Sequence, residues 1–212
     1  TNGNQHIILA NRNGRAIRFD ENDVRPMGRT ATGVKGMTLD DDGEDIVIGM
    51  ICMSPQSENS ILVVSEQGYG KRTKLNDEDG EPIYRITRRG GKGVKTLNIT
   101  EKTGKLVAIK SVTEDNDLMI INKSGITIRM NISDIRIMGR ATQGVRLINL
   151  EKRNDQIASV CKVDSEDTDD EIVELDKKEE IETFDVQYQD VDVEVDEDQE
   201  PLEDQDLDND LE

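Results

Sequence analysis

The stretch Thr87 to Gly93 (Thr-Arg-Arg-Gly-Gly-Lys-Gly) packs three cations and three glycines into seven residues. Lys and Arg neutralise phosphates without reading bases, and glycine lets the backbone approach closely and offer its N–H groups to phosphate oxygens. This combination predicts a surface that binds a polyanion. The whole chain carries a formal net charge of -19, so a cluster this basic needs an explanation.

The charge of the chain is divided between two regions. Residues 164–212 hold 25 acids and two bases, a net of -23, whereas residues 1–163 hold 21 acids and 25 bases, a net of +4. We therefore expect a mildly basic folded part over 1–163. The segment 164–212 is expected to be an acidic disordered tail, because like charges repel and keep it extended and solvated.

The elements that would position the basic stretch repeat along the chain. Three segments share an apolar run, a polar turn that closes on glycine, and a basic alternating strand, which predicts a β-hairpin each time. The turn glycines of the three hairpins are Gly14, Gly68 and Gly125.

A second pattern follows each hairpin. Residues 27–35 read MGRTATGVK, residues 87–95 read TRRGGKGVK and residues 138–146 read MGRATQGVR. We call these stretches the first, second and third signature. The second stands 25 residues beyond its hairpin glycine, counted to Gly93, and the other two stand 19 beyond theirs, which fits an insertion around 76–81.

After each signature we expect a short strand, ending at Leu39, Ile99 and Leu150, then a charged turn and a buried strand. Four strands per unit, repeating every 51 to 60 residues, predict an all-β fold of propeller-like blades with four antiparallel strands. Three blades are expected, over about 1–55, 56–113 and 114–163. Three blades do not close a ring comfortably, so we also expect further blades upstream of Thr1.

Equivalent positions on successive blades are expected to line one rim as a positive band. Bending a duplex around a protein costs several kcal/mol, so many weak phosphate contacts must offset that cost. The candidate DNA-binding residues are Arg88, Arg89, Gly90, Gly91, Lys92, Gly93 and Lys95 in the second signature, Arg29 and Lys35 in the first, Arg140 and Arg146 in the third, and Lys71 and Arg72 in the second hairpin.

Residues 88–93 resemble the core of the gyrase box, Gln-Arg-Arg-Gly-Gly-Lys-Gly, that marks the C-terminal DNA-wrapping domain of DNA gyrase A subunits. Residues 137–148 are similar to the last blade of that domain and 25–36 to an earlier one, so the likeness covers essentially all of 1–163. An acidic tail after the final blade is also familial. Two departures stand out: Thr87 replaces the Gln of the box, and the family's box lies in the first blade rather than in a later one.

The resemblance implies a β-pinwheel, a six-bladed propeller variant that wraps double-stranded DNA on its rim so that gyrase introduces negative supercoils with ATP. It implies a non-catalytic part of a type II topoisomerase in the bacterial cytoplasm. The implied partners are the B subunit of gyrase together with the rest of the A subunit, in an A2B2 assembly. No cofactor is expected in this chain, since ATP and Mg would be bound elsewhere. The acidic tail is expected to compete with DNA for the rim.

Two alternatives remain open at this point. One is the C-terminal domain of the topoisomerase IV A subunit, which favours decatenation, and the other is a protein-binding propeller with an acidic tail. Catalytic chemistry is not indicated: His6 is the only histidine, Gly91-Lys92-Gly93 lacks the Ser or Thr of a phosphate-binding loop, and no metal-ligand spacing involves Cys52 and Cys161. No apolar run approaches the ~18 residues of a membrane span.

Overall fold

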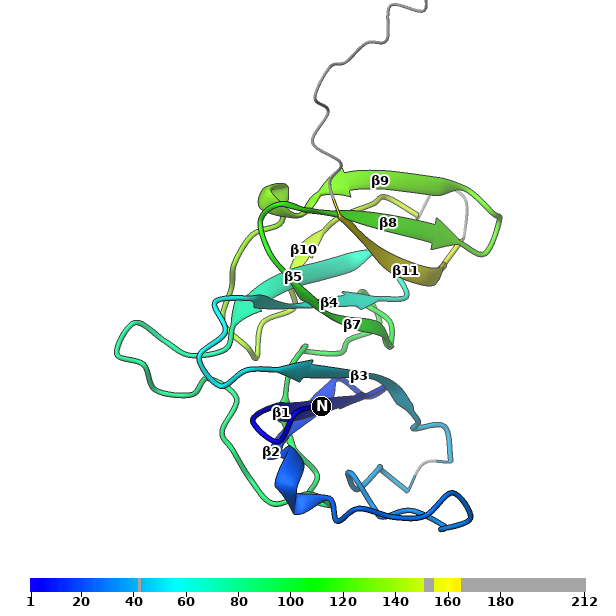
Figure 1. Ribbon diagram of the computed structural model, residues 1–212. Coiled ribbons are helices and arrows are strands. Elements are labelled where there is room, and N and C mark those ends of the chain that lie inside the picture. Colours follow the sequence, from blue (N-terminus) through cyan, green and yellow to red (C-terminus); the bar gives the residue numbers. More distant parts are fainter. Residues whose placement is uncertain (42, 151–154, 165–212) are drawn as a thin grey trace, which may run out of the picture. The chain divides into compact units, whose positions relative to one another are not determined.

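The computed structural model describes residues 1–41, 43–150 and 155–164 (Figure 1). Within that part, all strand pairs of the three sheets are antiparallel, and the predicted all-β fold is confirmed. Two single-turn 3-10 helices, η1 (Glu21–Asp23) and η2 (Ile132–Asp134), follow the hairpins of the first and third sheets. The predicted disorder of the acidic tail concerns residues outside the described ones, apart from Asp164, which ends a strand.

Three sheets follow one another along the chain. The first has the strand order β3 (Val47–Met53), β1 (His6–Asn11), β2 (Arg15–Asp20) and β6 (Val94–Lys95). The second has the order β10 (Val145–Arg146), β5 (Tyr69–Lys74), β4 (Ser60–Ser65) and β7 (Leu106–Val112). The third has β11 (Ile157–Asp164), β8 (Asn116–Asn122) and β9 (Thr127–Asn131).

The apolar cores lie between neighbouring sheets. Alternation along β1 sends Ile8 and Ala10 into a core shared with Ile61 and Val63 of β4, so the first two sheets pack face to face. A second core joins the strands of the second and third sheets. Each sheet therefore stabilises its neighbour, as in a propeller or repeat array where every unit buries the face of the next.

The short strand after each hairpin differs from the prediction. It falls inside the signature, at Val94–Lys95 and Val145–Arg146, and it pairs with the sheet of the preceding repeat rather than with its own. The segments that were expected to form short strands, ending at Leu39, Ile99 and Leu150, are not strands. The first and second sheets therefore each include one short strand from the next predicted blade range. Among the described residues the third sheet has three strands.

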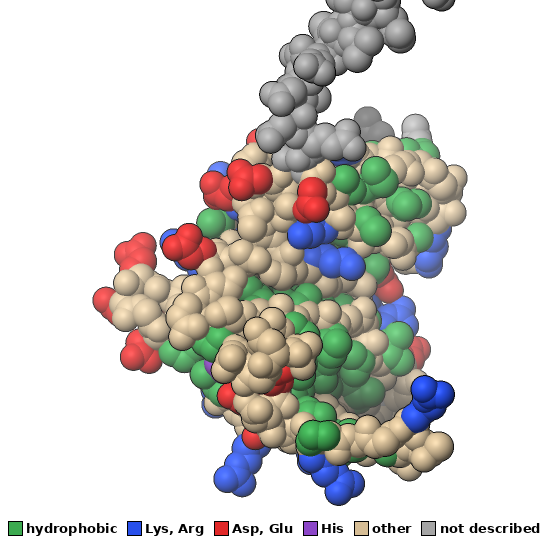
Figure 2. All heavy atoms as spheres, viewed as in Figure 1, with side chains coloured by type: hydrophobic (Ala, Val, Ile, Leu, Met, Phe, Trp, Pro, Cys, Tyr) green, Lys and Arg blue, Asp and Glu red, His purple; other side chains and the backbone are tan. Residues whose placement is uncertain are grey.

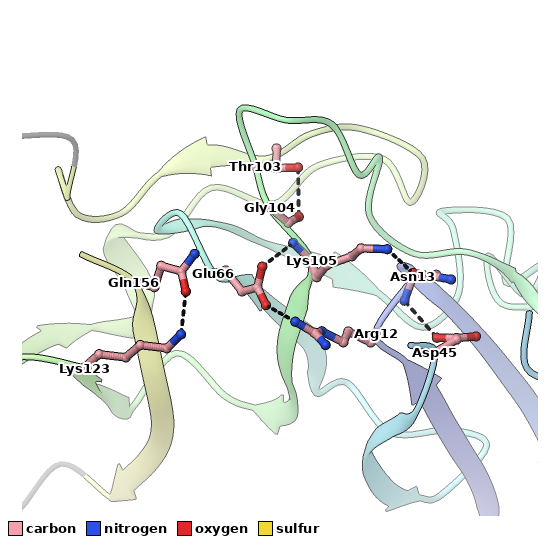
Figure 3. A network of polar contacts seen from close by, with 9 residues as sticks. All are labelled: Arg12, Asn13, Asp45, Glu66, Thr103, Gly104, Lys105, Lys123 and Gln156. Carbon is pink, nitrogen blue, oxygen red and sulfur yellow. Dashed lines mark hydrogen bonds and ion pairs between the residues drawn. The ribbon is translucent and has the colours of Figure 1, made fainter. Parts of the chain in front are cut away.

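The hairpin turns also connect neighbouring sheets (Figure 3). Arg12, in the turn of the first hairpin, forms a 2.8 Å ion pair with Glu66 in the turn of the second. The main-chain N–H of Leu106 donates to Arg12 O, and that of Ile157 donates to Glu66 O, so the same contact recurs one repeat further on. Burial acts to raise the pKa of Glu66, but the hydrogen bonds from Arg12 and from the Lys105 N–H outweigh it and lower that pKa.

The two cysteines do not lie in the core as their apolar neighbours suggest. Both are free thiols with exposed side chains. Cys52 stands between the buried Ile51 and Met53 on β3, so strand alternation turns it outward. Apolar composition located the strand, but only its pairing set which face is buried.

Candidate nucleic-acid interface

The second and third signatures each cross onto the preceding repeat. The second enters beside β2, where the Thr87 N–H donates to Arg18 O at 2.9 Å, and leaves as β6, whose Val94 pairs with Ala16. Residues 88–93 between these two points form a loop at the edge of the first sheet. The third signature repeats this path on β5, with the Met138 N–H donating to Arg72 O at 2.8 Å.

Successive signatures are hydrogen-bonded to one another. Arg89 of the second donates through Nη1 to Lys35 O of the first at 3.2 Å, and through Nε to Asp23 O at 3.0 Å. Arg140, the equivalent residue of the third, donates to Lys95 O of the second. The three signatures therefore form one continuous array, in which each is joined to the one before it.

Further main-chain contacts fix the same register. Thr38, just beyond the first signature, donates its N–H to Gly91 O at 2.9 Å, and its hydroxyl donates to Gly90 O at 2.6 Å. Asn98 takes the place of Thr38 in the next repeat and donates its N–H to Thr142 O at 3.0 Å. Thr38 and Asn98 were not among the predicted site residues, because a contact between repeats leaves no local sequence pattern.

The array presents cations to solvent. Six predicted ligands have exposed side chains, whereas Arg89 and Arg140 are half-buried in the contacts just described. In Figure 2, Lys and Arg side chains project along the lower and right-hand edges, while acidic side chains gather on the left. The exposed six are Arg29, Lys35, Arg88, Lys92, Lys95 and Arg146.

Arg146 is oriented by a tyrosine. Its Nε and Nη2 donate to the hydroxyl of Tyr69 at 3.1 and 2.9 Å, and its guanidinium carbon lies 5.5 Å from the centre of the Tyr69 ring. Cation–π contact and hydrogen bonding restrict this side chain while leaving it exposed. Tyr69 is thus a supporting residue that no sequence pattern singled out.

The glycines of the signatures serve different purposes. Gly93 has a φ of +70°, and a Cβ there would overlap the carbonyl group of Ala16 on β2. Gly144 has a φ of +79°, and its Cβ would lie 2.6 Å from Gly70 O on β5. These two glycines let the signature strand approach the preceding sheet, which is a packing role rather than the expected approach to phosphate. Gly91 is exposed and Gly90 half-buried.

The prediction that Lys71 and Arg72 bind DNA is wrong, because both side chains are buried. Lys71 is 0% exposed and Arg72 4%, so neither offers its charge to a ligand outside. Arg72 donates through Nε to Ile135 O at 2.7 Å and through Nη2 to Ser133 O at 3.3 Å. Lys71 is covered by the third signature, whereas Arg72, the next residue along β5, is covered by residues 133–135 just before that signature. The sequence pattern of a basic strand does not reveal either contact.

Lys71 lies beneath the third signature. Its Nζ donates to Gly139 O and Arg140 O, both at 2.6 Å, and contacts Thr142 O at 3.2 Å and Thr142 Oγ1 at 3.0 Å. Burial, and secondarily the charge of Arg140, lowers the pKa of Lys71 to about 8. Four oxygen acceptors compensate in part for the loss of water around the ammonium group.

Arg18 occupies in the first repeat the place of Arg72 in the second. It is 2% exposed, donates through Nε to His6 Nδ1 at 2.9 Å, and contacts Tyr84 O at 3.4 Å. Burial lowers the pKa of Arg18, and burial followed by the charge of Arg18 lowers that of His6. His6 is therefore a neutral acceptor in the joint between two repeats.

Within the part of the chain that the structure describes, no three His, Cys, Asp or Glu residues group as metal ligands would. None of its helices is long and apolar enough to cross a membrane.

Comparison with known families agrees with this geometry. The model of the DNA gyrase C-terminal domain, a beta-propeller, matches residues 5–52, 59–113 and 116–162, one segment for each repeat of the sequence. The chain belongs to this family. The predicted propeller-like architecture is thereby confirmed, and the resemblance noted in the signatures extends over all three repeats.

Curated relatives point the same way. The A subunit of DNA gyrase from Staphylococcus aureus is 46% identical over 171 residues in both strain MRSA252 and strain COL, covering 81% of this chain. The chain spans only 18% of the length of those relatives.

Solved structures share the fold. A DNA gyrase A C-terminal domain matches with a TM-score of 0.64 and 26% identity, covering 76% of this chain and 51% of that one. The C-terminal domain of DNA topoisomerase IV matches with a TM-score of 0.69 at 24% identity, covering 77% of this chain and 48% of that one. At that identity the topoisomerase IV likeness concerns the fold alone.

Proposed function

We propose that this chain binds double-stranded DNA without sequence preference and bends it around the signature array. The observation that carries the proposal is the continuity of that array: each signature is hydrogen-bonded to the one before it and presents exposed cations. Cations that recur on successive repeats along a fixed track suit the repeating phosphates of a duplex. The proposed phosphate ligands are Arg29, Lys35, Arg88, Arg89, Lys92, Lys95, Arg140 and Arg146, with the main chain of Gly90 and Gly91 beside them.

The same proposal extends to the whole protein. Membership of the gyrase family supports a non-catalytic, DNA-wrapping part of an ATP-dependent topoisomerase that introduces negative supercoils. Its partners would be the B subunit of gyrase together with the rest of the A subunit, in an A2B2 assembly within the bacterial cytoplasm, with ATP and Mg bound outside this chain. The family model favours gyrase over topoisomerase IV, and further blades upstream of Thr1 form part of this proposal.

The decisive experiment compares two triple variants of the full chain in duplex binding and bending assays. Replacing Arg88, Arg89 and Lys92 with Ala is expected to reduce the salt-dependence slope of log affinity by about 2 to 3, since each lost phosphate contact removes roughly 0.9. The matched control replaces Lys110, Lys123 and Lys162, three lysines outside the signatures, with Ala.

Two outcomes would count against the proposed DNA-binding array. An equal loss in both variants would show that net charge, and not the array, governs binding. Affinity that does not change with salt between about 50 and 200 mM would favour the protein-binding propeller instead.

Deleting residues 165–212 is expected to tighten DNA binding, because a tethered polyanion competes at high effective concentration.

A further inference from the structure

The second and third signatures turn their central peptides in opposite directions. In the third, the carbonyl of Arg140 points into the protein, where its oxygen lies 2.6 Å from the buried Lys71 Nζ. In the second, the equivalent peptide joins Arg89 to Gly90, and it is the Gly90 N–H that is bonded within the protein, to Gly36 O at 2.6 Å. One peptide therefore presents its oxygen to a partner within the protein and the other its N–H.

The residue at the third position of each turn accounts for the difference. Gly90 has a φ of +85°, as the third residue of a type II turn requires. Ala141 takes this place in the third signature, and its Cβ disfavours the left-handed region. That turn is closed by a hydrogen bond from the Thr142 N–H to Gly139 O at 3.3 Å. Its central carbonyl needs an interior partner, and Lys71 supplies one.

Peptide geometry then fixes where the opposite side points. In a trans peptide the N–H is antiparallel to the C=O of the preceding residue. Because Arg140 O points to the buried Lys71, the Ala141 N–H points away from it, and Ala141 is exposed. In the second signature the flipped peptide directs the Arg89 carbonyl, an acceptor, to that outer side.

The third signature is also poorer in charge. Gly139 and Gln143 stand where the second signature has Arg88 and Lys92. An outward N–H provides a donor for a phosphate oxygen at a site that lacks these cations.

Among the three repeats, only the second has a lysine at the position of Lys71. Ile17 and Ile128 occupy its place in the other two repeats, since Ile17 pairs with Leu9, Lys71 with Val63 and Ile128 with Ile120. The isoleucines show that an apolar side chain is sufficient for packing of the strand at this position. Burying an ammonium group there has a desolvation cost. The reason for a lysine in the second repeat therefore lies in the loop that Lys71 binds.

We propose that Lys71 is a positioning residue that holds the peptide between Arg140 and Ala141 with its N–H outward, and that this N–H donates to a DNA phosphate. The proposal rests on the proposed function, because it names a further contact on the same DNA track. Lys71 itself touches no DNA. It orients a main-chain donor from beneath the surface.

The test follows main-chain amide resonances of the full chain during titration with a short duplex. The Ala141 amide is expected to shift strongly, while the Gly90 amide, whose N–H is held by Gly36 O, serves as the internal control and shifts little. An Ala141 amide that does not move while the duplex binds would overturn the inference and leave the proposed function standing. If no duplex binds at all, the proposed function itself fails.

Variants at two positions separate positioning from folding. Lys71→Met is expected to weaken duplex binding about tenfold, as loss of a hydrogen bond to a charged group would. Lys162→Met, which removes one exposed charge, is the control and is expected to change affinity less than twofold. Adding Ala141→Gly to Lys71→Met permits the type II turn of the second signature.

The double variant Lys71→Met/Ala141→Gly is therefore expected to regain thermal stability without regaining affinity, since its central N–H then points inward. Recovery of full affinity in this variant would contradict the proposal. If Lys71→Met alone does not fold, the double variant and the amide titration of the unmodified chain still decide the question.

Discussion

The joint between the first two repeats and the free edge of the third repeat contain equivalent residues in different surroundings. At the joint, Gly14 packs against the residues that follow the second signature, where a Cβ would lie 2.7 Å from Leu97 O. Gly125, its equivalent in the third hairpin, has open space at that position and the same positive φ. The turn requires the glycine in both repeats, but only the joint adds a packing requirement.

The buried arginines differ in the same way. The side chain of Arg72 is 5% exposed because residues 133–135 of the following repeat cover it. That of Arg129, the equivalent on β9, is 49% exposed and bonded to Asp117 at 2.6 Å. Among the described residues no strand pairs with the outer edge of β9. Burial of this arginine is therefore supplied by the following repeat and not by its own hairpin.

The largest effect is expected at the signature glycines. Gly93→Ala should lower the free energy of unfolding by about 3 kcal/mol, because it adds backbone strain and an overlap with the Ala16 carbonyl. Gly33→Ala, at the equivalent site with open space, should cost only about 1 kcal/mol. Denaturant titration of both variants measures the difference, and equal losses would refute the packing role of the joint.

A smaller effect is expected at the arginines. Arg72→Met leaves the carbonyls of Ser133 and Ile135 without their donor in a buried site and should cost about 2 kcal/mol. Arg129→Met removes an ion pair whose arginine is half exposed, although its partner Asp117 is buried, and should cost about 1 kcal/mol. Thermal unfolding of the two variants provides the comparison. A larger loss at Arg129 would show that its own hairpin, not the joint, depends on this arginine.

The smallest effect concerns pH and Lys71. Its pKa is about 8 in the folded protein and 10.5 in an ordinary lysine, so between these values the unfolded chain binds more protons at this position. The free energy of unfolding relative to Lys71→Met should therefore rise with pH, by about 1 kcal/mol between pH 8 and pH 9. Below pH 7 the relative stability should be constant. No change between pH 8 and pH 9, followed by a fall above about pH 10.5, would mean that the folded state favours the charged amine.

Much of the fold could be predicted from the chain. The turn glycines Gly14, Gly68 and Gly125 and the apolar alternation around them were sufficient to predict three hairpins, since these are local requirements of φ and of strand periodicity. The repeated signatures located the exposed cations Arg88, Lys92 and Lys95, and their likeness to the gyrase family has been confirmed by the family model.

The errors have a common origin. Lys71 and Arg72 look like any basic strand residues, and Gly93 looks like any flexible loop glycine. In each case the deciding neighbour belongs to another strand or another repeat, as the Ala16 carbonyl does for Gly93. No window of the sequence contains that neighbour.

The sequence by itself determined the hairpins, the repeat and the rim chemistry of Thr87 to Gly93, because turn conformation, strand alternation and charge are properties of short segments. Only the tertiary structure decided which repeat completes each sheet, which cations are buried and which way the peptides of the signatures face. Those properties depend on contacts between residues about 45 to 80 positions apart, from Arg140 with Lys95 to Lys95 with Arg15. Such contacts exist only once neighbouring sheets have packed.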